Sequence, residues 1–168
     1  MSPTGGTRSY LAFGSNMGDR ARAIQDALDR LAAAGVQLQA RSPLYETEAV
    51  TPDPQPPYLN AVARVATRLD AHALLALGLQ IEAAMGRVRP AGRIQAPRPI
   101  DIDLLLHGAA VIDDPPALIV PHPRLLERPF VRIPLADVAE PGLVHPVTGE
   151  RLDSAPPSAA VVRRPGGA

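Results

Sequence analysis

Two spacings of apolar residues alternate along the first part of the chain, one typical of strands and one typical of helices. Residues 9–13 form a short apolar run that ends at Gly14, which predicts a buried strand followed by a turn. From Gly18 onward, apolar residues recur every three or four positions as far as Gly35. This spacing predicts an amphipathic helix that Gly35 ends.

The same spacings return in the middle of the chain. Alternation over residues 36–47, and again over 58–67, predicts two further strands separated by a proline-rich loop. Asp70 is placed to cap a second helix, because an aspartate side chain can accept a hydrogen bond from a first-turn amide. Apolar residues line one side of this helix, which we expect to end near Gly86.

The predicted elements then define a fold class. Residues 100–106 form the next predicted strand, followed by a short apolar segment at 117–120 and a brief helical stretch near 124–128. The main order is strand, helix, strand, strand, helix, strand, which is the split βαβ order of ferredoxin-like folds. We therefore expect an α+β sandwich whose antiparallel sheet carries both helices on one face.

Length and composition narrow the class of protein. The 168 residues fit one domain, 1–168, in which segments 1–6 and about 153–168 lack a hydrophobic pattern and are expected to be disordered. Lysine plus arginine equals aspartate plus glutamate, at 17 each, so the broad basic field of a nucleic-acid binder is missing. The absence of cysteine excludes disulfides and thiolate metal sites. Without a signal-peptide or membrane-spanning pattern, we expect a cytoplasmic protein.

Two aspartates lie inside the strand predicted over residues 100–106. Asp101 and Asp103 are two positions apart, so both carboxylates should point to one face, about 6.7 Å apart along the strand. Mg²⁺ prefers one or two carboxylates together with phosphate oxygens and water, so a cation between the two would remove their repulsion. A solvent-exposed strand end is the alternative, but the leucines at 104–106 favour a buried strand.

Several arginines precede this strand within a short stretch. Guanidinium groups bind phosphate through two parallel hydrogen bonds and keep their charge. Alone, such a cluster would more often be solvated or complement the helix dipole. Beside the aspartate pair, it predicts the cationic half of a phosphoryl-transfer site. The arginines are Arg87, Arg89, Arg93 and Arg98.

Three smaller features have both a structural and a functional interpretation. His122 lies between two prolines, which could present its ring to a phosphate or simply build a turn. Tyr58 and Phe130 are two of only five aromatic residues, and core packing is their ordinary role, although a planar heterocycle would need such partners. Residues 14–18 lack the lysine of a P-loop, so we interpret them as a strand-to-helix turn with Asn16 or Gly18 near the cap.

Six sequence blocks together resemble the 6-hydroxymethyl-7,8-dihydropterin pyrophosphokinase family. The blocks occur in the family's order and cover roughly residues 9 to 140, and the Pro-Arg-X-Ile-Asp-Ile-Asp block is highly specific for this family. One departure is Glu48, where many relatives carry proline. The blocks are residues 11–19, 45–47, 57–60, Glu82 with 86–89, 97–105, and 120–123 with 128–130.

The resemblance implies a folate-synthesis enzyme that transfers pyrophosphate from ATP to the hydroxymethyl group of the pterin and releases AMP. Asp101 and Asp103 would hold two Mg²⁺ ions that bridge the ATP phosphates. Arg87, Arg89 and Arg93 would be catalytic residues. Of these, Arg89 and Arg93 would lie on a loop that closes over the site. The two small molecules are the expected partners of a monomeric enzyme, and no nucleic-acid or membrane partner is expected.

Substrate-contacting residues also follow from the resemblance. ATP would be bound by Glu82, Arg87, Arg98, His122 and Arg128. The pterin would lie between the rings of Tyr58 and Phe130, with its polar edge met by Thr47, Asn60 and the backbone near Val50.

Two alternatives from other classes remain open on the residues alone. A small RNA-binding module can share a ferredoxin-like sheet, although the predicted strands lack an aromatic-rich RNA-contact motif. Another transferase with an Asp-X-Asp metal site, such as a nucleotidyltransferase or glycosyltransferase, would use the same carboxylate pair. The leaving group distinguishes these transferases from a pyrophosphokinase.

Overall fold

The computed structural model describes residues 6–49, 54–87 and 98–164. Predicted residues Val50, Arg89 and Arg93 lie outside these ranges. In chain order, the elements are β1 (Thr7–Ser15), α1 (Arg20–Ala33), β2 (Gln37–Arg41), β3 (Tyr45–Thr47), β4 (Tyr58–Thr67), α2 (Ala71–Ala84), β5 (Asp101–His107), β6 (Ile112–Asp114), β7 (Leu118–Val120), the 3₁₀ turn η1 (Leu125–Glu127), α3 (Pro129–Val138) and β8 (Val162–Arg163).

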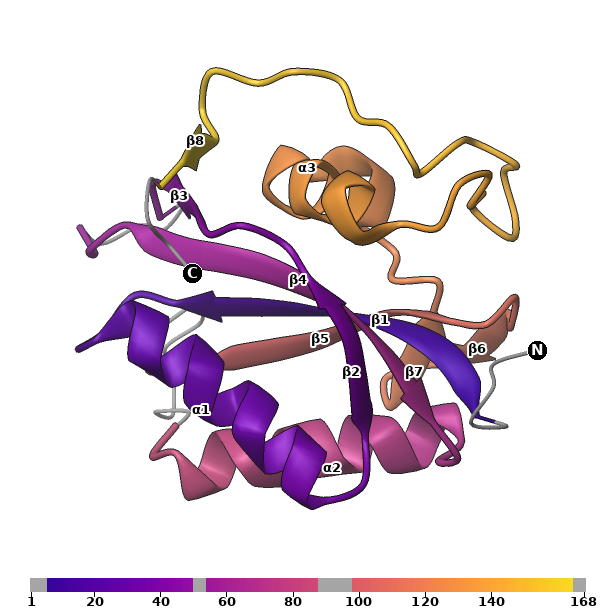
Figure 1. The fold of residues 1–168 in the computed structure, drawn as a ribbon, viewed down its shortest axis with the longest axis horizontal. Coiled ribbons are helices and arrows are strands. Elements are labelled where there is room, and N and C mark those ends of the chain that lie inside the picture. Colours follow the sequence, from indigo (N-terminus) through magenta and orange to yellow (C-terminus); the bar gives the residue numbers. More distant parts are fainter. Residues whose placement is uncertain (1–5, 50–53, 88–97, 165–168) are drawn as a thin grey trace.

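The main sheet has the strand order β5-β1-β4-β3-β8, with β2 also pairing with β4, and every pairing is antiparallel. Helices α1 and α2 cover one face of this sheet, whereas α3 lies on the opposite face (Figure 1). The predicted ferredoxin-like α+β sandwich, with both predicted helices on one face, is therefore confirmed. Helix α3 adds a third layer that the sequence pattern did not predict.

The predicted strand over residues 36–47 is divided into β2 and β3, both paired with β4. Pro43 lies between them and has no amide hydrogen to donate to the ladder. The Ser42 hydroxyl accepts a hydrogen bond from the backbone N–H of Val62 at 2.9 Å, and the Ser42 N–H donates to the Val62 carbonyl at 2.9 Å. A serine side chain therefore keeps β4 paired where the proline interrupts the strand.

Aspartates begin the two predicted helices. The side chain of Asp70 accepts a hydrogen bond from the N–H of Ala73 at 2.8 Å, which confirms the predicted cap of α2. In α1, the cap is Asp19, whose carboxylate accepts from the N–H of Arg22. Gly18, one of the two residues that we expected near this cap, directly precedes Asp19, whereas the side-chain amide of Asn16 is hydrogen-bonded to Gln55 and Arg98.

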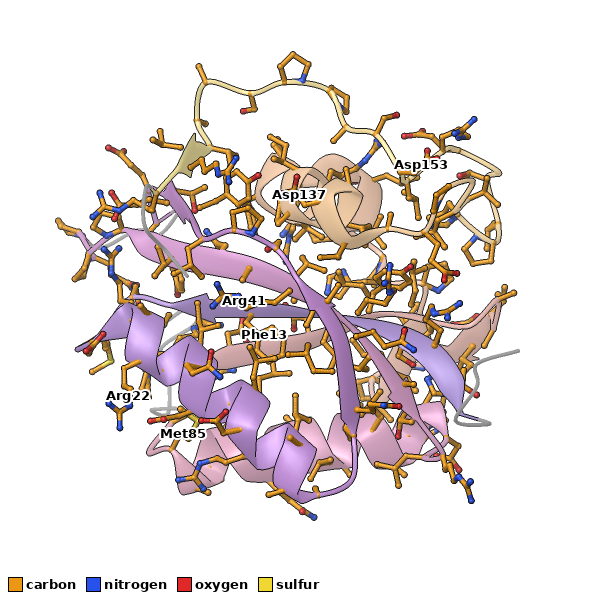
Figure 2. The ribbon with its side chains drawn as sticks, in the orientation of Figure 1. Phe13, Arg22, Arg41, Met85, Asp137 and Asp153 are labelled. Atoms are coloured by element: carbon orange, nitrogen blue, oxygen red, sulfur yellow. The ribbon has the colours of Figure 1, made fainter. Side chains whose placement is uncertain are left out.

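Each face of the sheet has its own apolar core. On the α1 and α2 side, Phe13 packs with Ile24 and Ile102 (Figure 2). On the α3 side, Tyr10 and Leu135 belong to a second cluster. The sequence pattern does not predict helix α3, because this helix has Pro at its start and Pro134 inside it, and proline normally marks a helix boundary. The sheet supplies the apolar surface that stabilises this helix.

The C-terminal segment follows a defined path, in contrast to the disorder expected from about residue 153. Residues 153–164 run past α3, and β8 then pairs antiparallel with β3 (Figure 1). The backbone N–H of Arg164 donates to the carbonyl of Leu44 at 2.8 Å. Edge pairing uses backbone groups and requires no apolar alternation, so a hydrophobicity pattern does not reveal it.

Candidate functional site

A cavity of about 520 Å³ opens on the α3 side of the sheet. Its walls come from β1, β3, β4 and β5, and from the chain that leads through η1 into α3. These elements are far apart in the sequence, so the sheet and α3 together create the cavity. Ten of the predicted site residues line it: Thr47, Tyr58, Asn60, Arg87, Arg98, Asp101, Asp103, His122, Arg128 and Phe130.

The aspartate pair at the start of β5 faces this cavity. Asp101 is registered opposite Gly14, and Asp103 opposite Ala12, both on β1. Both carboxylates line the cavity, whereas Ile102 between them is buried in the core under α2. The prediction that the two carboxylates share one face is confirmed. The small residues opposite them leave space for a ligand above the strand.

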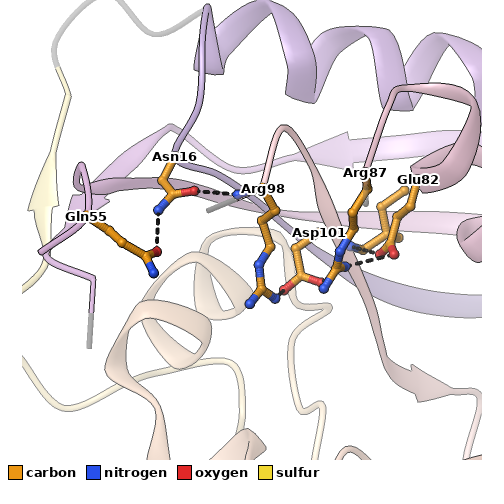
Figure 3. Close-up of polar contacts among 7 residues, drawn as sticks. Asn16, Gln55, Glu82, Arg87, Arg98 and Asp101 are labelled. Carbon is orange, nitrogen blue, oxygen red and sulfur yellow. Dashed lines mark hydrogen bonds and ion pairs between the residues drawn. The ribbon is translucent and has the colours of Figure 1, made fainter. Parts of the chain in front are cut away.

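Two ion pairs link Glu82, Arg87 and Asp101 (Figure 3). The guanidinium of Arg87 contacts the carboxylate of Glu82 at 2.8 Å and that of Asp101 at 2.7 Å. Glu82 also accepts a hydrogen bond from the backbone N–H of Ile102 at 2.7 Å. Burial lowers the pKa of Arg87, but the charges of Asp101 and Glu82 outweigh this effect and raise it. Arg87 therefore stays charged.

Glu82, which the resemblance assigns to ATP binding, contacts Arg87 in this structure, and its role towards ATP remains a prediction. It is buried below Asp101 and is absent from the described residues that line the cavity. Its carboxylate contacts the guanidinium of Arg87 and the backbone N–H of Ile102, the second residue of β5. Arg98, in contrast, lines the cavity and lies 3.4 Å from the carboxylate of Asp101.

Burial shifts the pKa values of two side chains that line the cavity. Burial and, to a smaller extent, the nearby charge of Asp101 raise the pKa of Asp103 to about 7, although Arg128 acts to lower it. Burial lowers the pKa of His122 to about 4, and the charge of Arg128 acts in the same direction. His122 is therefore neutral at pH 7, and its Nδ1 accepts a hydrogen bond from the N–H of Arg124 at 3.1 Å. The remaining proton is then on Nε2.

A divalent cation suits the carboxylate pair. Across the ranges that the structure describes, no three His, Asp or Glu side chains gather as a metal cluster. A cation at Asp101 and Asp103 would therefore need other oxygen ligands, such as phosphates and water. Mg²⁺ is usually held in this way, by one or two carboxylates, and a cation would also favour the ionised form of buried Asp103.

The cavity lining also combines flat rings with amide and hydroxyl groups. Tyr58 begins β4 and Phe130 lies in the first turn of α3. Asn60 donates from Nδ2 to the hydroxyl of Thr47 at 2.9 Å. The guanidinium of Arg128 lies 5.5 Å from the centre of the Phe130 ring, which joins the apolar and cationic parts. Contact of these residues with a pterin remains a prediction.

Asn16 is a site residue whose partners the sequence did not reveal. It is buried in the turn after β1, and its Nδ2 donates to the side chain of Gln55 at 3.1 Å and to the carbonyl of Pro56. Its Oδ1 accepts from the N–H of Arg98 at 2.9 Å (Figure 3). Asn16 thus joins the segments that lead into β4 and β5.

The fold and the cavity define a class: a ferredoxin-like α+β enzyme with a carboxylate pair facing basic side chains, as phosphoryl transfer requires. Residues 10–140 match the family described as 7,8-dihydro-6-hydroxymethylpterin-pyrophosphokinase (HPPK). The chain belongs to this family and is a pyrophosphokinase of folate biosynthesis.

Relatives agree with this assignment. The chain is 43% identical over 150 residues to the 2-amino-4-hydroxy-6-hydroxymethyldihydropteridine pyrophosphokinase of Methylorubrum extorquens, covering 89% of this chain and 91% of the relative. It is 41% identical over 145 residues to the Folic acid synthesis protein fol1 of Pneumocystis carinii, covering 86% of this chain and 19% of that protein. The chain thus spans nearly all of the bacterial relative and about a fifth of the fungal one.

Solved structures share the fold. The wild-type HPPK-DHPS of Plasmodium falciparum superposes with a TM-score of 0.67 at 14% sequence identity, over 88% of this chain and 44% of that one. Identity this low supports the fold alone. In the part of the chain that the structure describes, no helix is both long enough and apolar enough to cross a membrane.

Proposed function

We propose that the chain transfers the terminal pyrophosphoryl group of ATP to the hydroxymethyl oxygen of 6-hydroxymethyl-7,8-dihydropterin. The single observation that carries this proposal is that the Asp101–Asp103 pair and the Tyr58–Phe130 pair line one cavity. The carboxylates suit a metal-bound polyphosphate, and the rings suit a flat heterocycle. The two substrates would therefore meet within one cavity.

The reaction is a displacement at the β-phosphorus. The hydroxymethyl oxygen forms a bond to this phosphorus, and the bond from the same phosphorus to the oxygen that bridges to the α-phosphorus breaks. AMP leaves with the bonding electrons, and the hydroxyl proton passes to solvent. The protein acts by holding the two substrates in line and by stabilising negative charge, which is how phosphoryl-transfer sites usually act.

Asp101 and Asp103 would hold two Mg²⁺ ions. When bound, these ions neutralise phosphate charge and orient the polyphosphate. Arg87 and Arg98 lie beside the carboxylates and would contact the phosphates, as would Arg128, which also lines the cavity. Neutral His122 would donate a hydrogen bond from Nε2. Arg89 and Arg93 would close over the substrates, which is the role that the family resemblance implies for them.

The pterin would stack between Tyr58 and Phe130. Because the amide nitrogen of Asn60 already donates to Thr47, its carbonyl oxygen is the atom that can accept from an N–H of the ring. The backbone near Val50 would complete this edge. Glu82 would act on ATP only through Arg87, which it contacts directly. We also propose that the enzyme works as a cytoplasmic monomer, which size-exclusion chromatography and cell fractionation would test.

The decisive experiment mixes the protein with Mg²⁺, ATP and the hydroxymethyl pterin and measures AMP, with a control that omits the pterin. Asp101→Ala and Asp103→Ala should each lower turnover by more than about 100-fold, because charge neutralisation at the phosphates is lost. Asp113→Ala is the matched control, since Asp113 is an exposed strand aspartate on β6. Unchanged rates in both site variants would reject the metal assignment, and release of pyrophosphate in place of AMP would indicate another class of transferase.

A further inference from the structure

The segment 48–57 joins β3 to β4 beside the cavity. Its base is the antiparallel pair Thr47↔Tyr58, and both of these residues line the cavity. The spacing of the Tyr58 ring from the Thr47–Asn60 hydrogen bond therefore depends on how the two ends of the segment are held.

Arg20 contacts both ends of this segment at once. It is the first residue of α1, and its Nη2 lies 2.7 Å from the carboxylate of Glu46, just before the segment. Its Nη1 donates to the carbonyl of Pro57, the last residue of the segment, at 3.0 Å. The planar guanidinium can make both bonds without changing its own geometry, which a lysine cannot do.

The surroundings of Arg20 make this contact more than a surface ion pair. The side chains of Arg20 and Glu46 are only 24% and 27% exposed, so solvent screens their attraction less than it screens a fully exposed pair. Glu46 also lies 3.8 Å from the guanidinium of Arg164, which follows β8. The other end of the segment is held by Asn16, which donates to the carbonyl of Pro56.

We propose that Arg20 is a positioning residue for the pterin half of the site. By joining Glu46 to the Pro57 carbonyl, it holds the base of the segment closed, so that Tyr58 and Thr47 are correctly spaced before the substrate binds. Such preorganisation improves affinity because binding then orders fewer groups. This inference rests on the proposed function, and Arg20 itself is not one of the described residues that line the cavity.

The test compares Arg20→Ala with Arg22→Ala. Arg22 lies on the same helix, points away from the sheet, and is 74% exposed with only an ion pair to Asp26 (Figure 2). Arg20→Ala should raise KM for the pterin by roughly fivefold, the effect of losing about one hydrogen bond of ordinary net strength. It should leave KM for ATP and kcat nearly unchanged, and Arg22→Ala should change none of these constants.

Two further variants separate positioning from general stability. Arg20→Lys should recover part of the loss, because an ammonium group can still reach Glu46. Glu46→Gln should raise the same KM, and the Arg20→Ala/Glu46→Gln double variant should be no worse than the more damaging single variant, because both remove one contact. Calorimetric titration of the pterin, with a non-hydrolysable ATP analogue present, should follow the same order.

The proposal is overturned if Arg20→Ala matches Arg22→Ala, or if it changes both KM values and kcat in step with a lower melting temperature. It is also overturned if the double variant shows additive losses. A wild-type enzyme that releases no AMP in the presence of the pterin would instead reject the proposed function. The two failures are therefore distinct.

Discussion

Replacing Arg87 with methionine tests the buried ion-pair chain beneath the cavity. Methionine keeps a long apolar stem but removes the positive charge. The side chains of Arg87 and Glu82 are 7% and 4% exposed, so the substitution leaves a buried carboxylate without its counter-charge at 2.8 Å. Breaking a buried pair in this way costs about 3–5 kcal/mol of folding free energy. Asp101 is 25% exposed, so its part of the loss is smaller.

Urea unfolding, followed by circular dichroism, measures this loss. The midpoint of the Arg87→Met transition should fall while its slope stays constant, because the surface exposed on unfolding hardly changes. Arg98→Met is the matched control: its guanidinium lies 3.4 Å from Asp101, which is more exposed than Glu82, so we expect a loss below about 1 kcal/mol. Adding Glu82→Gln to Arg87→Met should recover part of the stability, because the buried carboxylate charge disappears.

Two results would refute this reasoning. The first is an Arg87→Met protein within about 1 kcal/mol of wild type, which would mean that solvent or a rearranged side chain compensates Glu82. The second is an equal loss in Arg98→Met, which would mean that burial does not decide the effect. Either result would remove the basis for assigning Glu82 to the support of Arg87.

The remaining predictions concern three side chains that line the cavity. Tyr58→Ala and Phe130→Ala should each weaken pterin binding by about 1–3 kcal/mol in calorimetry, as expected for loss of a stacked ring, and unchanged affinity would mean that both residues only pack in the core. His122 should titrate at about pH 4 by NMR, because burial and Arg128 oppose its charged form. Since its pKa is below the unfolded value of 6.5, its contribution to stability is complete above pH 6.5 and is lost as pH falls towards 4. A His122 resonance that titrates near 6.5 would contradict this.

Local patterns in the sequence correctly predicted α1, whose period of three to four reflects one apolar surface that must be covered. They also predicted the extent of β4, although this strand is buried on both faces, between α1 and α3. Helix α3 escaped prediction because Pro134 interrupts its pattern, and β8 because edge pairing is a backbone interaction. In both cases, the stabilising surface belongs to another part of the chain.

The chemistry of the site divides in the same way. The sequence by itself determined that Asp101 and Asp103 share a face, because alternation is a property of any strand. The family blocks also identified the enzyme class. Only the tertiary structure decided that Glu82 supports Arg87 from below, that Asn16 joins two distant segments, and that Arg20 contacts both ends of residues 48–57. Such contacts depend on where the sheet and helices bring separate segments together, and no local spacing encodes those distances.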